Sequence, residues 1–282
     1  MPSVVLDGID TAYAVEGAGP PLLMFSPGGF GATMGSWRTQ GLYARLNLLD
    51  HLTAQYTCIT FDKRESGRSG GRVEPLTWPA YAGQGLALLE HLGYQRAHLM
   101  GGCVGCSIVT TAATLQPDAV LSMVLYSPAG GARYRITQHE RLATHLAYVG
   151  QVGLDGGVAE ARSTDATFSA DPRLGPWVTV LRLDDVLATA YAALDVDGYA
   201  EVVRATASNL FGTDAVPGPA AEALMDLDVP TLVVPGQDSS HATSAARWLE
   251  ECVPGAQYWD VPVDGQTETT VPPRLLEFLT SV

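Results

Sequence analysis

Residues 101–105, Gly-Gly-Cys-Val-Gly, have the composition of a catalytic turn, because glycines stand two positions before and two positions after Cys103. The apolar run Ala97–Met100 precedes this turn, and an apolar, helix-compatible segment up to Leu115 follows it. A strand, a G-x-nucleophile-x-G turn and a helix in that order are typical of a nucleophile elbow. The two bare positions let the strand and the helix converge around a strained residue. The pattern therefore predicts that Cys103 is a nucleophile.

The chemistry expected of Cys103 is attack on an acyl carbon. A helix N-terminus favours the thiolate form of a cysteine, and Cys103 stands at the start of such a helix. The attacked carbonyl oxygen becomes negatively charged and needs N–H donors. We expect these donors to be the backbone amide of Val104 and that of Gly29 or Phe30, which lie in a glycine-rich turn. The alternative is that Cys103 is an inert small residue at a dead site.

A second cysteine, Cys106, completes a C-x-x-C pattern with Cys103. In another setting this pattern would indicate a thioredoxin-like redox pair, but the surrounding sequence argues against that fold. A disulfide or sulfenic acid that switches Cys103 off, or a packing role for Cys106, both remain open. One C-x-x-C is too little for a zinc site, and we expect no metal and no cofactor.

Apolar runs alternate with helix-period segments along most of the chain. Strands are predicted at residues 4–14 (two short strands), 21–25, 56–61, 97–100, 121–126, 230–234 and 257–261. Helices are predicted at residues 41–52, 81–92, 104–115, 244–252 and 273–279. Continuous apolar runs favour parallel strands that are buried on both faces. The alternation therefore predicts an α/β fold with a doubly wound, mostly parallel sheet.

The strand signal disappears between residues 130 and 229, where the sequence favours helices, including 136–152, 184–194 and 198–210. We predict that residues 130–229 form a helical cap over a core made of residues 1–129 and 230–282. Open α/β sheets bind ligands at the carboxyl ends of their strands, where such a cap would lie. Four aromatic residues of this segment would either line an apolar pocket or pack the cap onto the core. They are Trp177, Tyr191, Tyr199 and Phe211.

Further motifs give the chain a resemblance to the α/β-hydrolase family. The hairpin ending at residues 16–20 resembles the beginning of that family's fold, and Pro27–Gly31 resembles its H-G-G-type oxyanion loop, with Pro27 in place of the histidine. Residues 62–69 resemble its D-x-R-G-x-G-x-S turn, with Glu65 in place of a glycine. Residues 234–238 resemble the loop that carries the family's acid, which implies that Asp238 has this role.

The resemblance breaks at the catalytic base. In the family a histidine follows the last strand, but the corresponding turn here carries Gln266, through natural divergence or an engineered change. An amide cannot accept a proton near neutral pH. His241 lies three residues after Asp238, and a carboxylate at that spacing can orient an imidazole. We therefore predict that His241 replaces the missing base; the alternative is a capping or solvent role.

The remaining candidates for a base are weaker. His51, His91 and His98 fall in helix or strand positions and are expected to be structural. His139 and His145 lie six residues apart on the first helix of the cap segment, so they do not share one face closely. Glu65 and Glu268 are alternatives to His241. Without a well-placed base, the site would acylate readily and hydrolyse slowly.

The composition limits the partners. Hydrophobic residues make up 46% of the 282 residues and charged residues 16%, with a formal net charge of −14 and a single lysine, Lys63. An acidic chain without a basic cluster argues against nucleic acid and anionic membranes. No apolar run reaches the roughly 20 residues of a membrane helix. We expect a cytoplasmic protein with a small apolar acyl substrate, and a homo-oligomer stays open.

Together these features predict a hydrolase that acts on an ester, lactone or thioester through an acyl-enzyme on Cys103. The alternatives are an acyltransferase, cyclase or lyase in the same pocket, or a ligand-binding relative that has lost its base.

Overall fold

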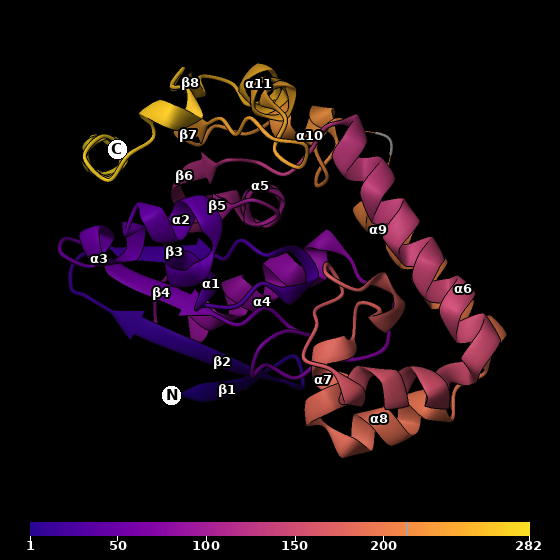
Figure 1. Ribbon diagram of the computed structural model, residues 1–282. Coiled ribbons are helices and arrows are strands. Elements are labelled where there is room, and N and C mark those ends of the chain that lie inside the picture. Colours follow the sequence, from indigo (N-terminus) through magenta and orange to yellow (C-terminus); the bar gives the residue numbers. More distant parts are fainter. Residues whose placement is uncertain (213) are drawn as a thin grey trace.

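The structure, a computed structural model, describes residues 1–212 and 214–282. In this part of the chain eight strands form one sheet in the order β1-β2-β4-β3-β5-β6-β7-β8 (Figure 1). The strands are β1 (Ser3–Leu6), β2 (Ile9–Glu16), β3 (Pro21–Phe25), β4 (Thr57–Phe61), β5 (Ala97–Gly102), β6 (Val120–Tyr126), β7 (Thr231–Val234) and β8 (Gln257–Tyr258). β1 and β2 pair antiparallel, and so do β2 and β4, whereas all pairings from β4 to β8 are parallel. The doubly wound, mostly parallel α/β fold is thereby confirmed.

Helices cover both faces of the sheet, because β3 to β7 carry apolar side chains on both faces and each face must be shielded from water. One face packs against α4 (Trp78–His91), α5 (Gly105–Leu115), α10 (Ala221–Met225) and α11 (Thr243–Cys252). The other face packs against α1 (Ser36–Thr39), α2 (Gly41–Arg45), α3 (Leu48–Leu52) and α12 (Val271–Thr280). Short 3-10 turns are η1 (Gly29–Gly31), η2 (Pro117–Ala119), η3 (Pro172–Leu174) and η4 (Val263–Gly265).

Two sequence predictions of single elements were wrong. The helix expected over residues 41–52 is split into α2 and α3, because Asn47 adopts a left-handed conformation with φ of 46°. The strand expected over residues 257–261 pairs only as far as Tyr258. Beyond it the amide of Val261 bonds back to the carbonyl of Trp259 at 2.8 Å, which turns the chain, and Pro262 has no N–H to continue a ladder.

A layer of helices lies beside the sheet (Figure 1): α6 (Ala132–Ser163), α7 (Val178–Leu183), α8 (Asp185–Ala192) and α9 (Val196–Leu210). The predicted helix end at residue 152 coincides with a break in α6 at Gly153, whose φ is 78°. Trp177, Tyr191 and Tyr199 are each at most 2% exposed, and the rings of Trp177 and Tyr191 both contact the ring of Tyr199. The indole N–H of Trp177 also donates to the carbonyl of Arg72 at 2.7 Å, so Trp177 joins this layer to the segment after β4 as well. That residues 130–229 form a separate cap stays a prediction.

Among the described residues, none of the helices is both long and apolar enough to cross a membrane.

Candidate active site

Cys103 lies in a sharp turn between β5 and α5. Its φ of 56° is left-handed, a strained conformation for any residue with a Cβ. The amide of Cys103 bonds to the carbonyl of Tyr126 on the neighbouring strand at 3.2 Å, which fixes the turn to the sheet edge. A Cβ on Gly105 would lie 2.1 Å from the carbonyl oxygen of Phe25, and one on Gly101 would lie 2.4 Å from the carbonyl carbon of Gly105. The two glycines thus permit the close approach that the turn requires.

Cys103 is also the accessible cysteine. It is partly exposed, whereas Cys58, Cys106 and Cys252 are buried. The Cys106 thiol donates to the carbonyl of Gly101 at 3.2 Å, and burial raises its pKa well above the usual value. Because a protonated, enclosed thiol is unreactive, the contacts of Cys106 fit a packing role.

His241 is held at the same sheet edge by the loop that follows β7. Gly130, beyond the end of β6, forms an isolated parallel bridge with His241, and its amide bonds to the carbonyl of Ser240 at 2.9 Å. A Cβ on Gly236 would lie 2.4 Å from the Cβ of His241, so the glycine makes room for the imidazole. The bridge and this glycine bring a residue far along the chain next to the end of β6.

Asp238 orients the imidazole. Both carboxylate oxygens of Asp238 lie 2.9 Å from Nδ1 of His241, and the Oδ1 atom also accepts the amides of Ser240 at 2.8 Å and His241 at 2.9 Å. Burial alone would raise the pKa of Asp238, but these bonds and the charge of His241 lower it. The carboxylate is therefore ionised and fixes a proton on Nδ1, which turns Nε2 into the working nitrogen.

The pKa of His241 reflects its neighbours. Burial lowers it, but interactions with the Cys103 side chain and then with Asp238 outweigh burial and raise the pKa to about 9. Nε2 is buried and forms no well-aligned hydrogen bond with any described residue. The Cys103 side chain thus lies close enough to influence the charge of His241, and Nε2 is free to exchange a proton with a bound reactant.

The turn η1 supplies the other half of the site. Gly28 and Gly29 have φ of 126° and 63°, and the Ser66 hydroxyl donates to the carbonyl of Phe30 at 2.5 Å. In the described part of the chain, the amides of Gly29, Phe30 and Val104 donate no hydrogen bond. Unpaired amides beside a nucleophile are what an oxyanion hole requires.

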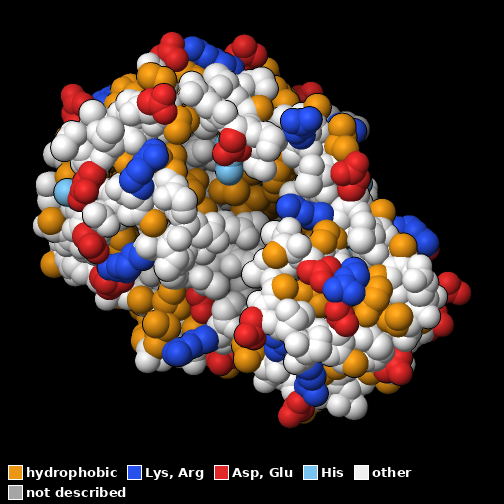
Figure 2. All heavy atoms as spheres, in the orientation of Figure 1, with side chains coloured by type: hydrophobic (Ala, Val, Ile, Leu, Met, Phe, Trp, Pro, Cys, Tyr) orange, Lys and Arg blue, Asp and Glu red, His pale blue; other side chains and the backbone are white. Residues whose placement is uncertain are grey.

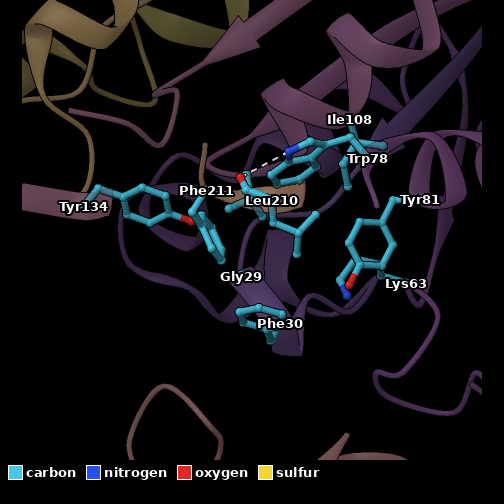
Figure 3. A pocket seen from close by; sticks show the side chains of 10 residues that line it. Gly29, Phe30, Lys63, Trp78, Tyr81, Ile108, Tyr134, Leu210 and Phe211 are labelled. Atoms are coloured by element: carbon cyan, nitrogen blue, oxygen red, sulfur yellow. Dashed lines mark hydrogen bonds between the residues drawn. The ribbon is translucent and has the colours of Figure 1, made fainter. Parts of the chain in front are cut away.

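These three residues line a pocket (Figure 3). Its other walls are formed by Lys63, Trp78, Tyr81, Ile108, Tyr134, Leu210 and Phe211. Val104, which lines the pocket, directly follows Cys103, and Cys103 packs against the hydrophobic core on this face of the sheet. Of the four aromatic residues considered from the sequence, Phe211 lines this pocket.

A wider, more polar depression is lined by His241 together with Asp238, Tyr43 and Ser127. Figure 2 shows a hollow with apolar side chains at its base and histidine and acidic side chains at its rim. The site therefore has an apolar side and a polar, open side.

Gln266, at the position expected for the base, is fully buried. Its Oε1 accepts the Tyr126 hydroxyl at 2.6 Å, and its Nε2 donates to the carbonyls of Pro235 at 2.8 Å and Val261 at 3.3 Å. The side-chain amide thus forms its hydrogen bonds within the protein. These contacts do not support a role for Gln266 as a substitute for the base.

The other candidate bases also have partners of their own. Glu65 pairs with Arg64 at 2.9 Å, and Glu268 bonds to Asn47 at 3.1 Å and His51 at 3.0 Å. His145 is buried, which lowers its pKa to about 4. Of the acidic and histidine side chains considered from the sequence, the structure thus brings Asp238 and His241 to the elbow.

The comparisons with known proteins identify the fold. Residues 21–153 match a sequence model described as alpha/beta hydrolase fold. The enol-lactonase from Burkholderia xenovorans LB400 superposes with a TM-score of 0.62 over 99% of this chain and 100% of that one, at 19% identity. The chain has the α/β-hydrolase fold.

Other proteins similar to this α/β-hydrolase-fold chain differ in their activities. The esterase RhEst1 from Rhodococcus sp. ECU1013 has a TM-score of 0.59 and 20% identity, covering 99% of this chain and 96% of that one. The dihydrolipoyllysine-residue acetyltransferase component of the acetoin cleaving system from Cupriavidus necator is 31% identical over 125 residues. That match covers 44% of this chain and 31% of the relative, so the chain spans about a third of that protein's length.

Sequence reasoning missed two features of the site. Tyr126, at the end of β6, binds the amide at the family's histidine position, and Lys63 lies in the wall of the pocket. The single lysine of the chain, placed directly after a buried strand and Asp62, was a signal that could have drawn attention to Lys63.

Proposed function

We propose that this protein is a hydrolase of an ester, lactone or thioester, and that it works through an acyl-enzyme on Cys103. The observation that carries the proposal is the arrangement of His241, whose Nδ1 is held by Asp238 at 2.9 Å and whose pKa the Cys103 side chain helps to raise. A nucleophile, a base and a residue that orients the base form the unit required for nucleophilic catalysis. The similarity to proteins named as an esterase and an enol-lactonase supports the same reaction class.

In the first half of the reaction, the Cys103 sulfur attacks the carbonyl carbon and forms a C–S bond. The carbonyl oxygen becomes negative and accepts hydrogen bonds from the amide of Val104 and that of Gly29 or Phe30. When the tetrahedral intermediate collapses, the bond to the leaving group breaks and His241 transfers its Nε2 proton to that group. The acyl-enzyme remains.

In the second half, water attacks the thioester while Nε2 of His241 accepts the proton of the water. The C–S bond then breaks, the carboxylic acid leaves and the Cys103 thiolate returns to its pairing with the imidazolium. His241 thus performs the step that Gln266 cannot, which removes the reason for expecting slow hydrolysis.

Acyl transfer to another nucleophile is the second candidate. It is supported by the polar depression beside His241, which could hold an acceptor, and by the similarity to a protein named as an acetyltransferase component. A cyclase, a lyase or a binding protein without catalysis would use the pocket differently.

Intact-mass analysis tests the proposal directly. The protein is mixed with p-nitrophenyl acetate, the reaction is quenched at short times, and the intact mass is measured by mass spectrometry. The variants Cys103→Ala and His241→Ala are treated in the same way. We expect an acetyl adduct on Cys103 that water clears in the wild type, no adduct in Cys103→Ala, and a persistent adduct in His241→Ala.

Iodoacetamide supplies the control for access. Because Cys103 is the partly exposed cysteine, it should be alkylated first. Alkylation without any acylation by esters would overturn the proposal in favour of a binding protein. An adduct cleared by alcohols or amines but not by water would favour acyl transfer.

A further inference from the structure

Lys63 is a buried cation in the wall of the apolar pocket. It is the single lysine of the chain and is 5% exposed. Its ammonium donates to the carbonyl of Arg64 at 3.2 Å and lies 4.1 Å from the centre of the Tyr81 ring. Within residues 1–212 and 214–282 no carboxylate lies within 4 Å of it, since Glu65 pairs with Arg64 instead. An ammonium has three donors, so Lys63 keeps hydrogen-bonding capacity in reserve.

Tyr81 adds a second unpaired donor at the same place. Its side chain is 3% exposed, and its hydroxyl is buried without a hydrogen-bond partner among the described residues. Figure 3 shows the Tyr81 hydroxyl and the Lys63 amine next to each other at one end of the pocket. A buried hydroxyl without a hydrogen-bond partner costs roughly 1–3 kcal/mol of folding free energy. Two donors with free hydrogen-bonding capacity at one place therefore indicate a binding site for an acceptor.

The position of these donors relative to the reaction centre suggests which part of a ligand supplies the acceptor. Gly29 and Phe30, the candidate donors to the oxyanion, line the same pocket. The rest of its lining is largely apolar and aromatic, including Trp78 and Leu210. An acyl group bound at Cys103 would therefore extend along apolar walls toward Lys63 and Tyr81.

We propose that Lys63 and Tyr81 bind a carboxylate at the far end of the acyl group. This inference rests on the proposed function, because it assumes that the acyl part of the substrate occupies this pocket. The oxygens of a carboxylate accept hydrogen bonds from both free donors, and its negative charge adds to that of the nearby Glu65 in stabilising the buried ammonium. The preferred substrates are thus mono-esters or thioesters of dicarboxylic acids, with the free carboxylate pointing away from Cys103.

The charge state of Lys63 agrees with this role. Burial lowers its pKa to about 8, against the opposing effect of Glu65. The amine is therefore mostly cationic at neutral pH and loses its charge as the pH rises above 8. Selectivity for the carboxylated substrate should fall over the same range.

Matched ester pairs test the proposal. The p-nitrophenyl mono-esters of glutaric, adipic and pimelic acid are compared with the p-nitrophenyl esters of valeric, hexanoic and heptanoic acid. In the wild type, kcat/KM for the carboxylated ester should exceed that for its apolar partner at one or more chain lengths. In Lys63→Met, we expect a loss of about ten- to a hundred-fold for the carboxylated ester only, the range expected for a hydrogen bond to a charged group.

Two further variants keep the test interpretable. Tyr81→Phe should reduce the same preference by a smaller factor, and it removes one oxygen from the core without changing its shape. Arg274→Met removes a surface cation on α12 and should leave the preference unchanged. Equal rates for both esters in the wild type, or equal losses for both in Lys63→Met, would overturn the proposal.

A binding measurement separates this proposal from the acyl-enzyme proposal. Calorimetry on Cys103→Ala with monomethyl adipate and with methyl hexanoate needs no catalysis. Tighter binding of monomethyl adipate that is lost in Cys103→Ala/Lys63→Met would support the carboxylate site even if Cys103 proved unreactive. If the two ligands bind with equal affinity, the proposed carboxylate site is ruled out, whatever the rates of ester hydrolysis are.

Discussion

Asp238 and His241, three residues apart in one loop, form a carboxylate–imidazole pair in which both carboxylate oxygens lie 2.9 Å from Nδ1. The same carboxylate accepts the backbone amides of Ser240 and His241. One side chain therefore shapes the loop and orients the base. The pair is local in sequence, whereas its contact with the Cys103 elbow depends on the bridge between Gly130 and His241.

Replacing Asp238 by asparagine should lower the pKa of His241, because the charge and hydrogen bond of the carboxylate are among the causes that raise it. An asparagine can also present its amide to Nδ1 and select the wrong tautomer. We expect kcat/KM for ester hydrolysis to fall by about a hundred-fold or more, as is usual when general acid–base catalysis is lost. Histidine titration by NMR and steady-state kinetics measure the two effects. An unchanged rate with an unchanged pKa would contradict the role of Asp238.

The pH dependence of acylation should show the pKa of His241, which lies near 9. Below that pH the imidazolium can protonate a leaving alkoxide, and above it the proton is lost. Acylation by an ethyl ester, whose leaving group needs a proton, should therefore decline as the pH rises through about 9. Acylation by a p-nitrophenyl ester, whose leaving group departs without one, should not decline there. Stopped-flow or quench-flow rates from pH 6 to 10 compare the two esters; parallel profiles would contradict this assignment.

Gln266→His should fail to raise ester turnover and should destabilise the protein. The native amide makes three hydrogen bonds in a fully buried position, including that from the Tyr126 hydroxyl at 2.6 Å. An imidazole cannot reproduce all three, and each unsatisfied buried group costs about 1–3 kcal/mol. Urea unfolding and ester kinetics test this expectation. Tyr126→Phe is the matched control for stability, since it removes only the hydroxyl partner. A gain in turnover would show instead that the position still serves as a base site.

Gly105→Ala should disrupt the elbow. The added Cβ would lie 2.1 Å from the carbonyl oxygen of Phe25, a backbone atom of β3 that cannot move without shifting the sheet. We expect a loss of about 3 kcal/mol or more in the free energy of unfolding, together with loss of Cys103 acylation. Gly83→Ala in α4 is the control, because a Cβ there meets nothing within 4 Å. Thermal unfolding of the two variants should differ strongly; similar curves would contradict the steric argument.

The sequence alone determined the elbow and the buried parallel strands around it. Glycines two before and two after Cys103 are a local steric requirement, and continuous apolar runs indicate buried parallel strands wherever they occur. The pairing of Asp238 with His241 could likewise be proposed, since a loop of three residues limits how far the two side chains can separate. Local rules failed where a single residue overrides a periodic pattern, as Asn47 does between α2 and α3.

The tertiary structure alone decided the relationships between distant residues. Gln266 meets Tyr126 across 140 positions. Lys63 meets Tyr81 because the segment that follows β4 is hydrogen-bonded to Gln84 of α4. Neither pairing can be recognised from a periodic pattern or a motif in the sequence. Each depends on which strand ends and helix faces come together when the chain folds. Lys63 and the Tyr81 hydroxyl lack hydrogen-bond acceptors only in the folded chain, where they are buried. In the unfolded chain water accepts hydrogen bonds from both.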